Sequence, residues 1–216
     1  YQEWKDNLKV YYTEMTKDII GSQVKGKKLV SSGTTNIHPV WAPDGQRFAY
    51  LSNQDNDYFG QTDLFVYNFS NSKSEKVVGG VKTAPTWIND STLIYTKHSK
   101  PNKWGSKYFD LYRYTFSDEE EKRLTYNSRL ISPIYNKNLN NILAITSYDG
   151  TSNIMIAEHI DILDDSLDFR PITQFDNGIQ LLSLAWNEKK LLVDGVYHQG
   201  RQIYEVKIEN GDLVPF

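Results

Sequence analysis

Short alternations of apolar and polar residues recur along most of the chain and indicate β-strands with one solvent-exposed face. The clearest example is His38–Ser52, with the sequence HPVWAPDGQRFAYLS. Two short strands flank Asp44-Gly45, and this dipeptide favours a tight turn because Gly tolerates a positive φ and Asp bonds its own backbone. The stretch therefore predicts a β-hairpin.

The same hairpin pattern returns three more times along the chain. Its prolines, Pro39, Pro85 and Pro133, are 46 and 48 residues apart, and a fourth copy without the proline contains Trp186. Each copy is followed by a polar residue and an alternating strand, and then by one more short strand. A period in the forties with four strands per unit is typical of a β-propeller blade.

A propeller assigns structural roles to the recurring residues. The prolines are expected to start the innermost strand of each blade, where a missing N–H is tolerated. Asp63 and Asp110 stand in register at the entrance to a strand, where an aspartate more often bonds a turn than acts in catalysis. One aromatic residue per unit is expected to pack between adjacent blades: Trp41, Trp87, Tyr135 and Trp186.

The beginning of the chain follows a different pattern. Apolar residues recur at spacings of three and four over Tyr1–Ile20, which predicts an amphipathic helix that stops at Gly21 and packs on a neighbouring domain. We expect a helix and linker over residues 1–26 and propeller blades over residues 27–216, beginning with a lone strand at Lys27–Val30. The four units cover about residues 37–80, 81–126, 130–175 and 179–216.

The number of units leaves two architectures open. Because the fourth unit already contains its own last strand, the leading strand at Lys27–Val30 favours an open arc that is part of a larger ring. A closed ring of four blades is the alternative, since propellers commonly have four to eight blades.

The repeat resembles that of the TolB-like β-propellers. The first unit has the pattern P-x-W-x-P-D-G, with Ala42 at the position that is usually Ser, and the second keeps Pro85 and Trp87 but has Asn89-Asp90 in the turn. Similar repeats occur in prolyl-oligopeptidase-like and tricorn-like proteases, and in bacterial envelope proteins in which a metallopeptidase-like domain precedes the propeller. The resemblance covers about residues 27–216 and implies an all-β propeller; it is much less specific for function.

Composition narrows the classes of function. Aromatic residues make up 13% of the chain and hydrophobic residues 39%, a mixture that favours half-exposed strands. The net charge of -3 argues against a nucleic-acid partner, and no apolar run approaches the ~20 residues of a membrane span. The absence of Cys excludes disulfides, thiolate catalysis and Cys-based zinc sites. Since the chain starts at Tyr1 without a signal peptide, we expect a fragment or a processed chain.

The loop KHSKPNKWGSKY, residues 97–108, is the strongest candidate for contact with a partner. Basic and aromatic residues together are typical of recognition surfaces for an acidic peptide, a glycan or a protein. The alternative is that the loop tryptophan folds back onto its blade. The candidate residues are Lys103, Trp104 and Tyr108 in this loop, Tyr58 and Phe59 in the matching loop of unit one, and His38 at the expected channel mouth.

The sequence contains only weak indications of a metal-binding site and no motif of a catalytic site. Asp55 and Asp57 place carboxylates at alternating positions, as calcium loops do, but the Gly and the distal Glu of an EF-hand are missing, so a plain polar loop is the alternative. Nucleophile elbows, HExxH, P-loops and GxGxxG are absent from the sequence. We therefore expect no cofactor, and no catalytic residue in this chain.

These observations predict a non-catalytic protein- or ligand-binding propeller of a bacterial envelope protein, periplasmic or extracellular. The expected partner is a protein or peptide, and an exposed blade face would also favour a homodimer or additional blades. One alternative is a propeller that gates or regulates an attached peptidase whose catalytic domain lies outside this chain. A weaker alternative is a carbohydrate-binding propeller, since aromatic rings also stack on sugars.

Overall fold

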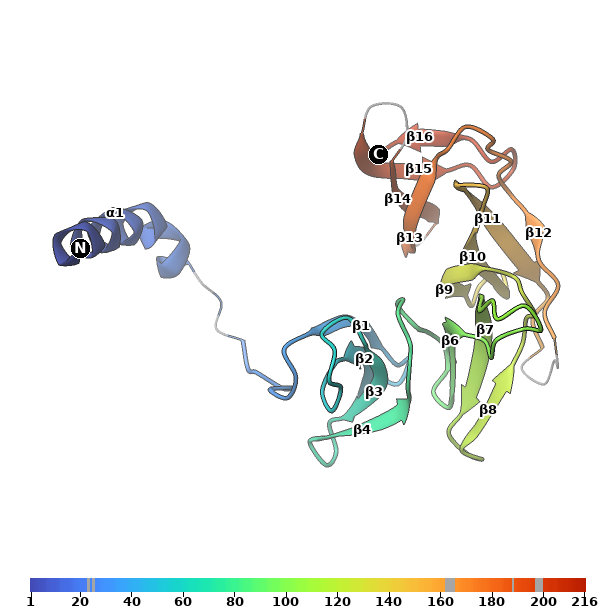
Figure 1. Ribbon diagram of the computed structural model, residues 1–216, viewed down its shortest axis with the longest axis horizontal. Helices are drawn as coiled ribbons and strands as arrows, with labels where there is room; N and C mark the ends of the chain where they lie inside the picture. The colour runs from blue at the N-terminus through green and yellow to red at the C-terminus, as the bar shows by residue number, and fades with distance from the viewer. Residues whose placement is uncertain (23, 25, 162–165, 188, 197–199) are drawn as a thin grey trace. The chain divides into compact units, whose positions relative to one another are not determined.

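The computed structural model of the protein describes residues 1–22, 24, 26–161, 166–187, 189–196 and 200–216. One helix, α1 (Gln2–Gly21), precedes an all-β region (Figure 1). The chain divides into two compact units, Tyr1–Ser31 and Ser32–Phe216, and each is considered by itself.

The helix forms where the apolar period predicts it, but its end differs. Gly21 is the last helical residue, and the chain leaves the helix at Ser22 with a φ of -98°, so Gly21 does not act as a left-handed stop. No residue of α1 is buried, and the packing expected for its apolar stripe stays a prediction. No helix in the described part of the chain is long and apolar enough to cross a membrane.

The strand expected at Lys27–Val30 is not formed. These residues have no regular secondary structure, and none of the described strands pairs with them. A β-strand needs a neighbouring backbone to satisfy its N–H and C=O groups, and no described strand lies beside the sequence KKLV to supply one.

The remaining strands form four antiparallel sheets of four strands, each sheet in sequence order, which confirms the predicted blades. Blade 1 consists of β1 (Asn36–Trp41), β2 (Arg47–Ser52), β3 (Asp63–Asn68) and β4 (Lys73–Val78). Blade 2 consists of β5 (Thr86–Asn89), β6 (Thr92–His98), β7 (Phe109–Thr115) and β8 (Glu120–Arg123). Blade 3 consists of β9 (Leu130–Asn136), β10 (Asn141–Tyr148), β11 (Thr151–Glu158) and β12 (Arg170–Pro171). Blade 4 consists of β13 (Gln180–Asn187), β14 (Lys190–Val196), β15 (Arg201–Val206) and β16 (Leu213–Pro215).

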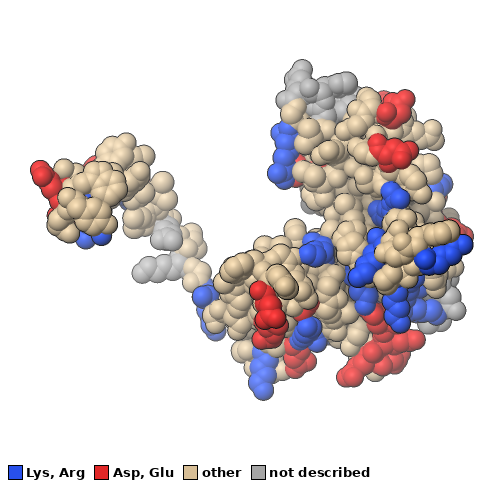
Figure 2. All heavy atoms as spheres, in the orientation of Figure 1, with Lys and Arg blue, Asp and Glu red and all other residues tan. Residues whose placement is uncertain are grey.

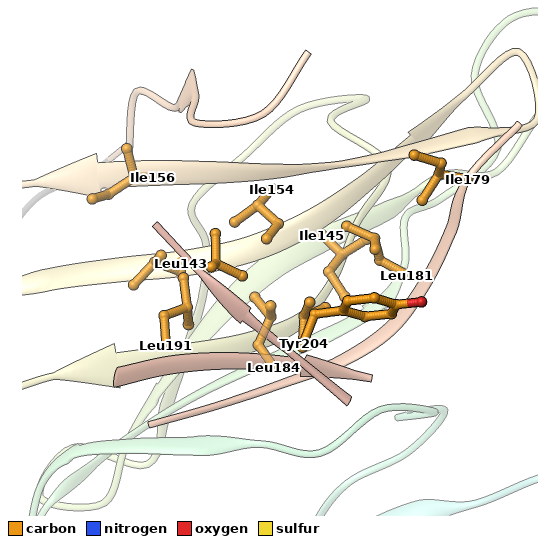
Figure 3. Close-up of a cluster of buried hydrophobic side chains, with 11 residues drawn as sticks. Leu143, Ile145, Ile154, Ile156, Ile179, Leu181, Leu184, Leu191 and Tyr204 are labelled. Carbon is orange, nitrogen blue, oxygen red and sulfur yellow. The ribbon is translucent and has the colours of Figure 1, made fainter. Parts of the chain in front are cut away.

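Successive blades bury one another's apolar faces. β1 lies against β5, β9 against the first three strands of blade 2, and β13 against the first three strands of blade 3. Figure 3 shows the last of these interfaces, where Leu143 and Ile154 of blade 3 lie opposite Leu191 and Tyr204 of blade 4. Among the described strands, those of blade 1 do not contact those of blade 4.

The aromatic residues predicted to lie between blades fall into two groups. Trp87 is only 6% exposed and its Nε1 donates a hydrogen bond of 3.1 Å to the carbonyl of Val40 in blade 1. Tyr135 and Trp186 are partly buried in the next two interfaces. Trp41 is 58% exposed, so the prediction is wrong for this residue, because no described blade lies beside this face of blade 1.

The prolines do not all start an inner strand. Pro85 lies immediately before β5, but Pro39 and Pro133 lie within β1 and β9, at interruptions of the register with β2 and β10. A β-bulge tolerates proline because the ladder of hydrogen bonds is interrupted there. His38 and Ser132, which precede these prolines, have φ values of 54° and 50° and complete the bulges.

Asp63 and Asp110 are buried structural residues. Asp63 is the first residue of β3 and Asp110 the second residue of β7, the third strands of their blades. Each accepts a hydrogen bond from a backbone N–H of the connection to the next blade, and each forms an ion pair with the fourth strand. The partners are Gly80 N (2.9 Å) and Lys76 for Asp63, and Ser128 N (2.9 Å) and Arg123 (2.6 Å) for Asp110. The repeated aspartate therefore ties three parts of a blade together.

Candidate functional site: the loop face and the central cavity

Two kinds of loop lie together on one side of the blades. One joins the second and third strands of a blade, and the other leads to the next blade. Lys82, in the connection from blade 1 to blade 2, donates to the carbonyl of Gly60 in the blade 1 loop. Arg129, in the connection from blade 2 to blade 3, lies over the rings of Tyr108 and Tyr148 beside the loops of those two blades. We call this side the loop face.

A cavity of about 430 Å³ lies among the inner strands β1, β5, β9 and β13. The bulges in β1 and β9 place His38 and Ser132 in its wall, because a bulge re-aims the side chains of the strand that carries it. The Ser132 hydroxyl donates to the carbonyl of Leu182 at 3.2 Å. Lys82 and Ser183 add further polar groups. The cavity therefore joins all four blades and reaches the loop face through the connection that carries Lys82.

A group of cations stacked on aromatic rings covers the loop face of blades 2 and 3. Arg129 is sandwiched between two tyrosines, with its guanidinium carbon 4.8 Å from the centre of the Tyr108 ring and 4.6 Å from that of Tyr148. We call this group the cation–aromatic rim; it consists of Lys103 over Trp104 (4.6 Å), Arg123 over Tyr126 (4.4 Å), and Arg129 with Tyr108 and Tyr148. Figure 2 shows Lys and Arg side chains gathered over blade 2.

The blade 1 loop on this face carries two carboxylates, Asp55 and Asp57. Tyr58 and Phe59 are exposed there, and Asp55 and Asp57 line a hollow of about 350 Å³ together with Phe59. In the described part of the chain, no three His, Asp or Glu side chains are grouped closely enough to hold a metal ion. A calcium site at Asp55 and Asp57 stays a prediction.

The histidine of this face contributes little positive charge. Burial, and then the charges of Lys107 and Lys82, lower the pKa of His98, which stacks on Phe109 with 3.9 Å between ring centres. The imidazole is therefore neutral near pH 7, since even an unperturbed histidine is mostly neutral there. Lysine and arginine carry the positive charge of the rim.

The sequence pointed to part of this surface. Trp104 is 77% exposed, so it does not fold back onto its blade, and Tyr58, Phe59 and His38 are on the loop face or in the cavity wall as expected. Sequence reasoning missed Arg129, together with Arg123, Tyr126 and Tyr148. The signal available was the tetrapeptide YNSR at 126–129, in which a tyrosine and an arginine flank a connection between two units.

The chemistry of the surface suits binding. None of the described residues that line the central cavity is a carboxylate, so its wall lacks the pair of carboxylates that glycoside hydrolases use. The rim offers positive charges and flat aromatic faces. A guanidinium stacked on rings keeps the N–H donors at its edges available for a carboxylate.

Comparison with known proteins identifies relatives for part of the chain. No protein-family model matches it. The Tol-Pal system protein TolB of Ruthia magnifica subsp. Calyptogena magnifica is 31% identical over 101 residues, which are 45% of this chain and 22% of that protein. The protein of the same name from Alcanivorax borkumensis is 31% identical over 64 residues, 29% of this chain and 14% of that protein. The matches span less than a quarter of either relative.

Solved structures extend the likeness to most of the blades. TolB from Acinetobacter baumannii covers 88% of this chain at a TM-score of 0.66 and 17% identity, over 45% of its own length. A putative TolB from Agrobacterium tumefaciens covers 86% of this chain at a TM-score of 0.66 and 15% identity, over 67% of its own length. A puromycin-hydrolyzing peptidase of Mycobacterium tuberculosis covers 88% of this chain at a TM-score of 0.64 and 13% identity, over 30% of its own length. The four blades of this chain are therefore a TolB-like β-propeller.

Proposed function

We propose that this propeller is a non-catalytic protein-binding module of the bacterial periplasm, and that its loop face binds an acidic segment of a partner protein. The observation that carries the proposal is the cation–aromatic rim, with Arg129 between Tyr108 and Tyr148. The relatives named as parts of the Tol-Pal system are bacterial and belong to a multi-component system, which supports a protein partner and the envelope as the location.

The rim has the properties of a binding hot spot. Arginine, tryptophan and tyrosine dominate the energetics of protein interfaces, because they bury a large area and combine it with directed polar contacts. Trp104 and Tyr126 are exposed, so their apolar area is available for burial by a partner. The acidic sector at Asp55 and Asp57 would repel a carboxylate-rich segment, and this directs such a segment toward blades 2 and 3.

A peptide-binding experiment tests this proposal. A short fluorescein-labelled peptide of alternating Glu and Tyr is titrated with the 216-residue chain, and fluorescence anisotropy is recorded at several salt concentrations. We expect saturable binding that weakens as salt screens the charges. Arg129→Ala removes the stacked cation and should weaken binding by about tenfold, the effect expected of one hot-spot residue.

Lys73→Ala is the matched control, because Lys73 is an exposed cation at the start of β4, at the end of blade 1 opposite the loop face. Its affinity should equal that of the wild type. The proposal fails if the acidic peptide does not bind, or if Lys73→Ala weakens binding as much as Arg129→Ala does.

A second candidate function is a propeller attached to a peptidase, which the fold shared with the puromycin-hydrolyzing peptidase favours. In that case the central cavity would restrict the passage of substrate to a catalytic domain. The test is hydrolysis of peptides of increasing length by the product of the intact gene. Ser132→Trp, which fills the cavity wall, should then slow the hydrolysis of long peptides more than that of short ones.

A further inference from the structure

A pocket of about 410 Å³ lies between blades 2 and 3, beside the cation–aromatic rim. Three parts of the chain line it: the connection between the two blades, the strands β10 and β11, and the segment that leads into β12. It shares no lining residue with the central cavity. We call it the interblade pocket. Its walls come from two neighbouring blades, so its shape does not depend on what lies beside blade 1 or blade 4.

The floor of the interblade pocket is apolar and belongs to the core between the two blades. Leu124 and Leu130 are 2% and 1% exposed, and Met155 and Leu167 are partly buried against the same cluster. The backbone N–H of Leu167 donates to the carbonyl of Leu124 at 3.0 Å, which fastens the segment before β12 to blade 2. The floor is therefore fixed by packing and by a hydrogen bond before any ligand arrives.

Three hydroxyl groups in the pocket wall already have partners inside the protein. Thr146 donates to the carbonyl of Ser128 at 3.1 Å. The Thr125 and Ser128 hydroxyls lie 2.8 Å apart, and both donate to the carboxylate of Asp110. An apolar group that enters the pocket would therefore leave none of these hydroxyls without a hydrogen bond, and it would avoid the cost of burying one unpaired.

Two exposed rings stand in the walls of the pocket and connect it to the rim. Tyr126 is 66% exposed and Tyr148 is 58% exposed, and both line the pocket. Each ring also carries a guanidinium, Arg123 on Tyr126 and Arg129 on Tyr148. Aromatic rings pack well against other rings and against a thioether such as that of Met155. An aromatic side chain is therefore the apolar group that these walls suit best.

The charges around the pocket separate the place for a ring from the place for a carboxylate. Asp168 lines the pocket and is exposed, so a carboxylate inside the pocket would meet a like charge. Arg123 is neutralised by Asp110 at 2.6 Å. Arg129 contacts two rings and, within the described residues, has no acidic partner. The charges therefore favour a neutral ring inside the pocket and a carboxylate outside it, at Arg129.

We propose that the interblade pocket holds an aromatic side chain of the acidic partner segment, while carboxylates adjacent to that side chain bind at Arg129. This inference rests on the proposed function, and it narrows the partner to a segment in which an aromatic residue is next to acidic ones. The pocket volume lies within the range of ~300–1,000 Å³ that is usual for small-molecule sites, which is room enough for one large ring.

Two peptides of equal length and charge separate this inference from the proposed function. One alternates Glu and Tyr, the other alternates Glu and Ala, and both carry fluorescein for anisotropy measurements with the wild-type chain. We expect the peptide with tyrosine to bind about tenfold more tightly, the effect of one buried aromatic anchor. If neither peptide binds, the proposed function fails and this inference fails with it. If both bind with equal affinity, the proposed function stands and only this inference is overturned.

A substitution that fills the pocket locates the preference. Ser166 is an exposed residue of the pocket wall, so Ser166→Trp should remove the difference in affinity between the two peptides. Ser117→Trp is the matched control, because Ser117 is exposed in the turn between β7 and β8, at the end of blade 2 opposite the loop face. It should keep the full difference. A preference for tyrosine that survives Ser166→Trp unchanged overturns the inference.

Photocrosslinking of the wild-type chain gives the same answer without relying on the folding of a variant. One tyrosine of the peptide is replaced by p-benzoylphenylalanine, the complex is irradiated, and the attachment sites are mapped by mass spectrometry. Crosslinks to Met155 or Leu167 are expected, since both lie in the pocket. Crosslinks confined to residues outside the pocket, such as Trp104 of the rim, overturn the inference.

Discussion

At the residue scale, the buried aspartates show how one side chain ties a blade together. Asp63 accepts hydrogen bonds from Asn56 (3.0 Å) and from the backbone of Gly80, and it pairs with Lys76. Burial by itself raises the pKa of this carboxyl, but the bonds from Lys76, Gly80 and Asn56 lower the pKa by more, so the net shift is downward. Asp63 is therefore held in its charged form by the folded chain.

This shift predicts the sign of a pH effect on stability. A carboxyl with a lowered pKa in the folded state stabilises the fold above its unfolded pKa of about 3.9, and the contribution is lost as the pH falls through the folded value. Asp63→Asn should reduce the free energy of unfolding by about 2 kcal/mol at pH 7. The difference between variant and wild type should shrink below about pH 4, as measured by urea unfolding.

Asp118→Asn is the control for that experiment. Asp118 is exposed in the turn between β7 and β8, so its substitution should leave the curve of stability against pH unchanged. The contrary result is a loss in free energy of unfolding, caused by Asp63→Asn, that stays constant down to the lowest pH measured. That result would mean that the charge of Asp63 contributes nothing to stability and that only the shape of its side chain matters.

At the element scale, the turn between β1 and β2 forms as the dipeptide Asp44-Gly45 predicts. Asp44 accepts a hydrogen bond of 2.8 Å from the backbone N–H of Gln46, and Gly45 has a φ of 67°. That bond and, with it, Arg47 lower the pKa of Asp44, although burial opposes the shift. The turn chemistry is local, which is why the sequence alone could place it.

A substitution at Gly45 isolates the backbone cost of this turn. A Cβ at this position would meet no atom within 4 Å, so Gly45→Ala should cost only the strain of a left-handed alanine, about 1 kcal/mol. Chemical denaturation measures the change. Gly60→Ala, also in open space but without a left-handed φ, should cost close to nothing, and equal losses in both variants would contradict the argument.

At the scale of the whole molecule, stability depends on interfaces between blades. A single four-stranded sheet buries one face only when another sheet packs on it, so neighbouring blades are expected to unfold together. Leu143 and Leu191 lie opposite each other between blades 3 and 4 (Figure 3). The apolar cluster that contains them is the largest link between these two blades.

Leu143→Ala should therefore destabilise both blades. The cavity left in a fully buried site costs about 3 kcal/mol. Native-state hydrogen exchange should show lower protection in β14 and β15 as well as in β10, with a smaller change in β2 and β3. Leu139→Ala, at an exposed position in the turn before β10, is the control; loss of protection confined to β10 would argue for independent blades.

The sequence by itself determined the repeating unit. Alternation, turn dipeptides and a period in the forties are local properties, and they predicted four blades, the hairpin at Asp44-Gly45 and a structural role for Asp63 and Asp110. The sequence also pointed to the loop around Trp104. These features depend on residues close together in the chain, where backbone geometry and side-chain patterning act directly.

Only the tertiary structure decided which side chains meet across units and which remain uncovered. Arg129 lies between Tyr108 and Tyr148 because blades 2 and 3 bring three separate segments together, and nothing local to any of them encodes that contact. Trp41 and Trp87 both follow a proline by two residues, but one is exposed and the other buried, because burial depends on a neighbouring sheet. The repeat specifies the fold of each blade, and the neighbouring blades determine which of its side chains stay exposed.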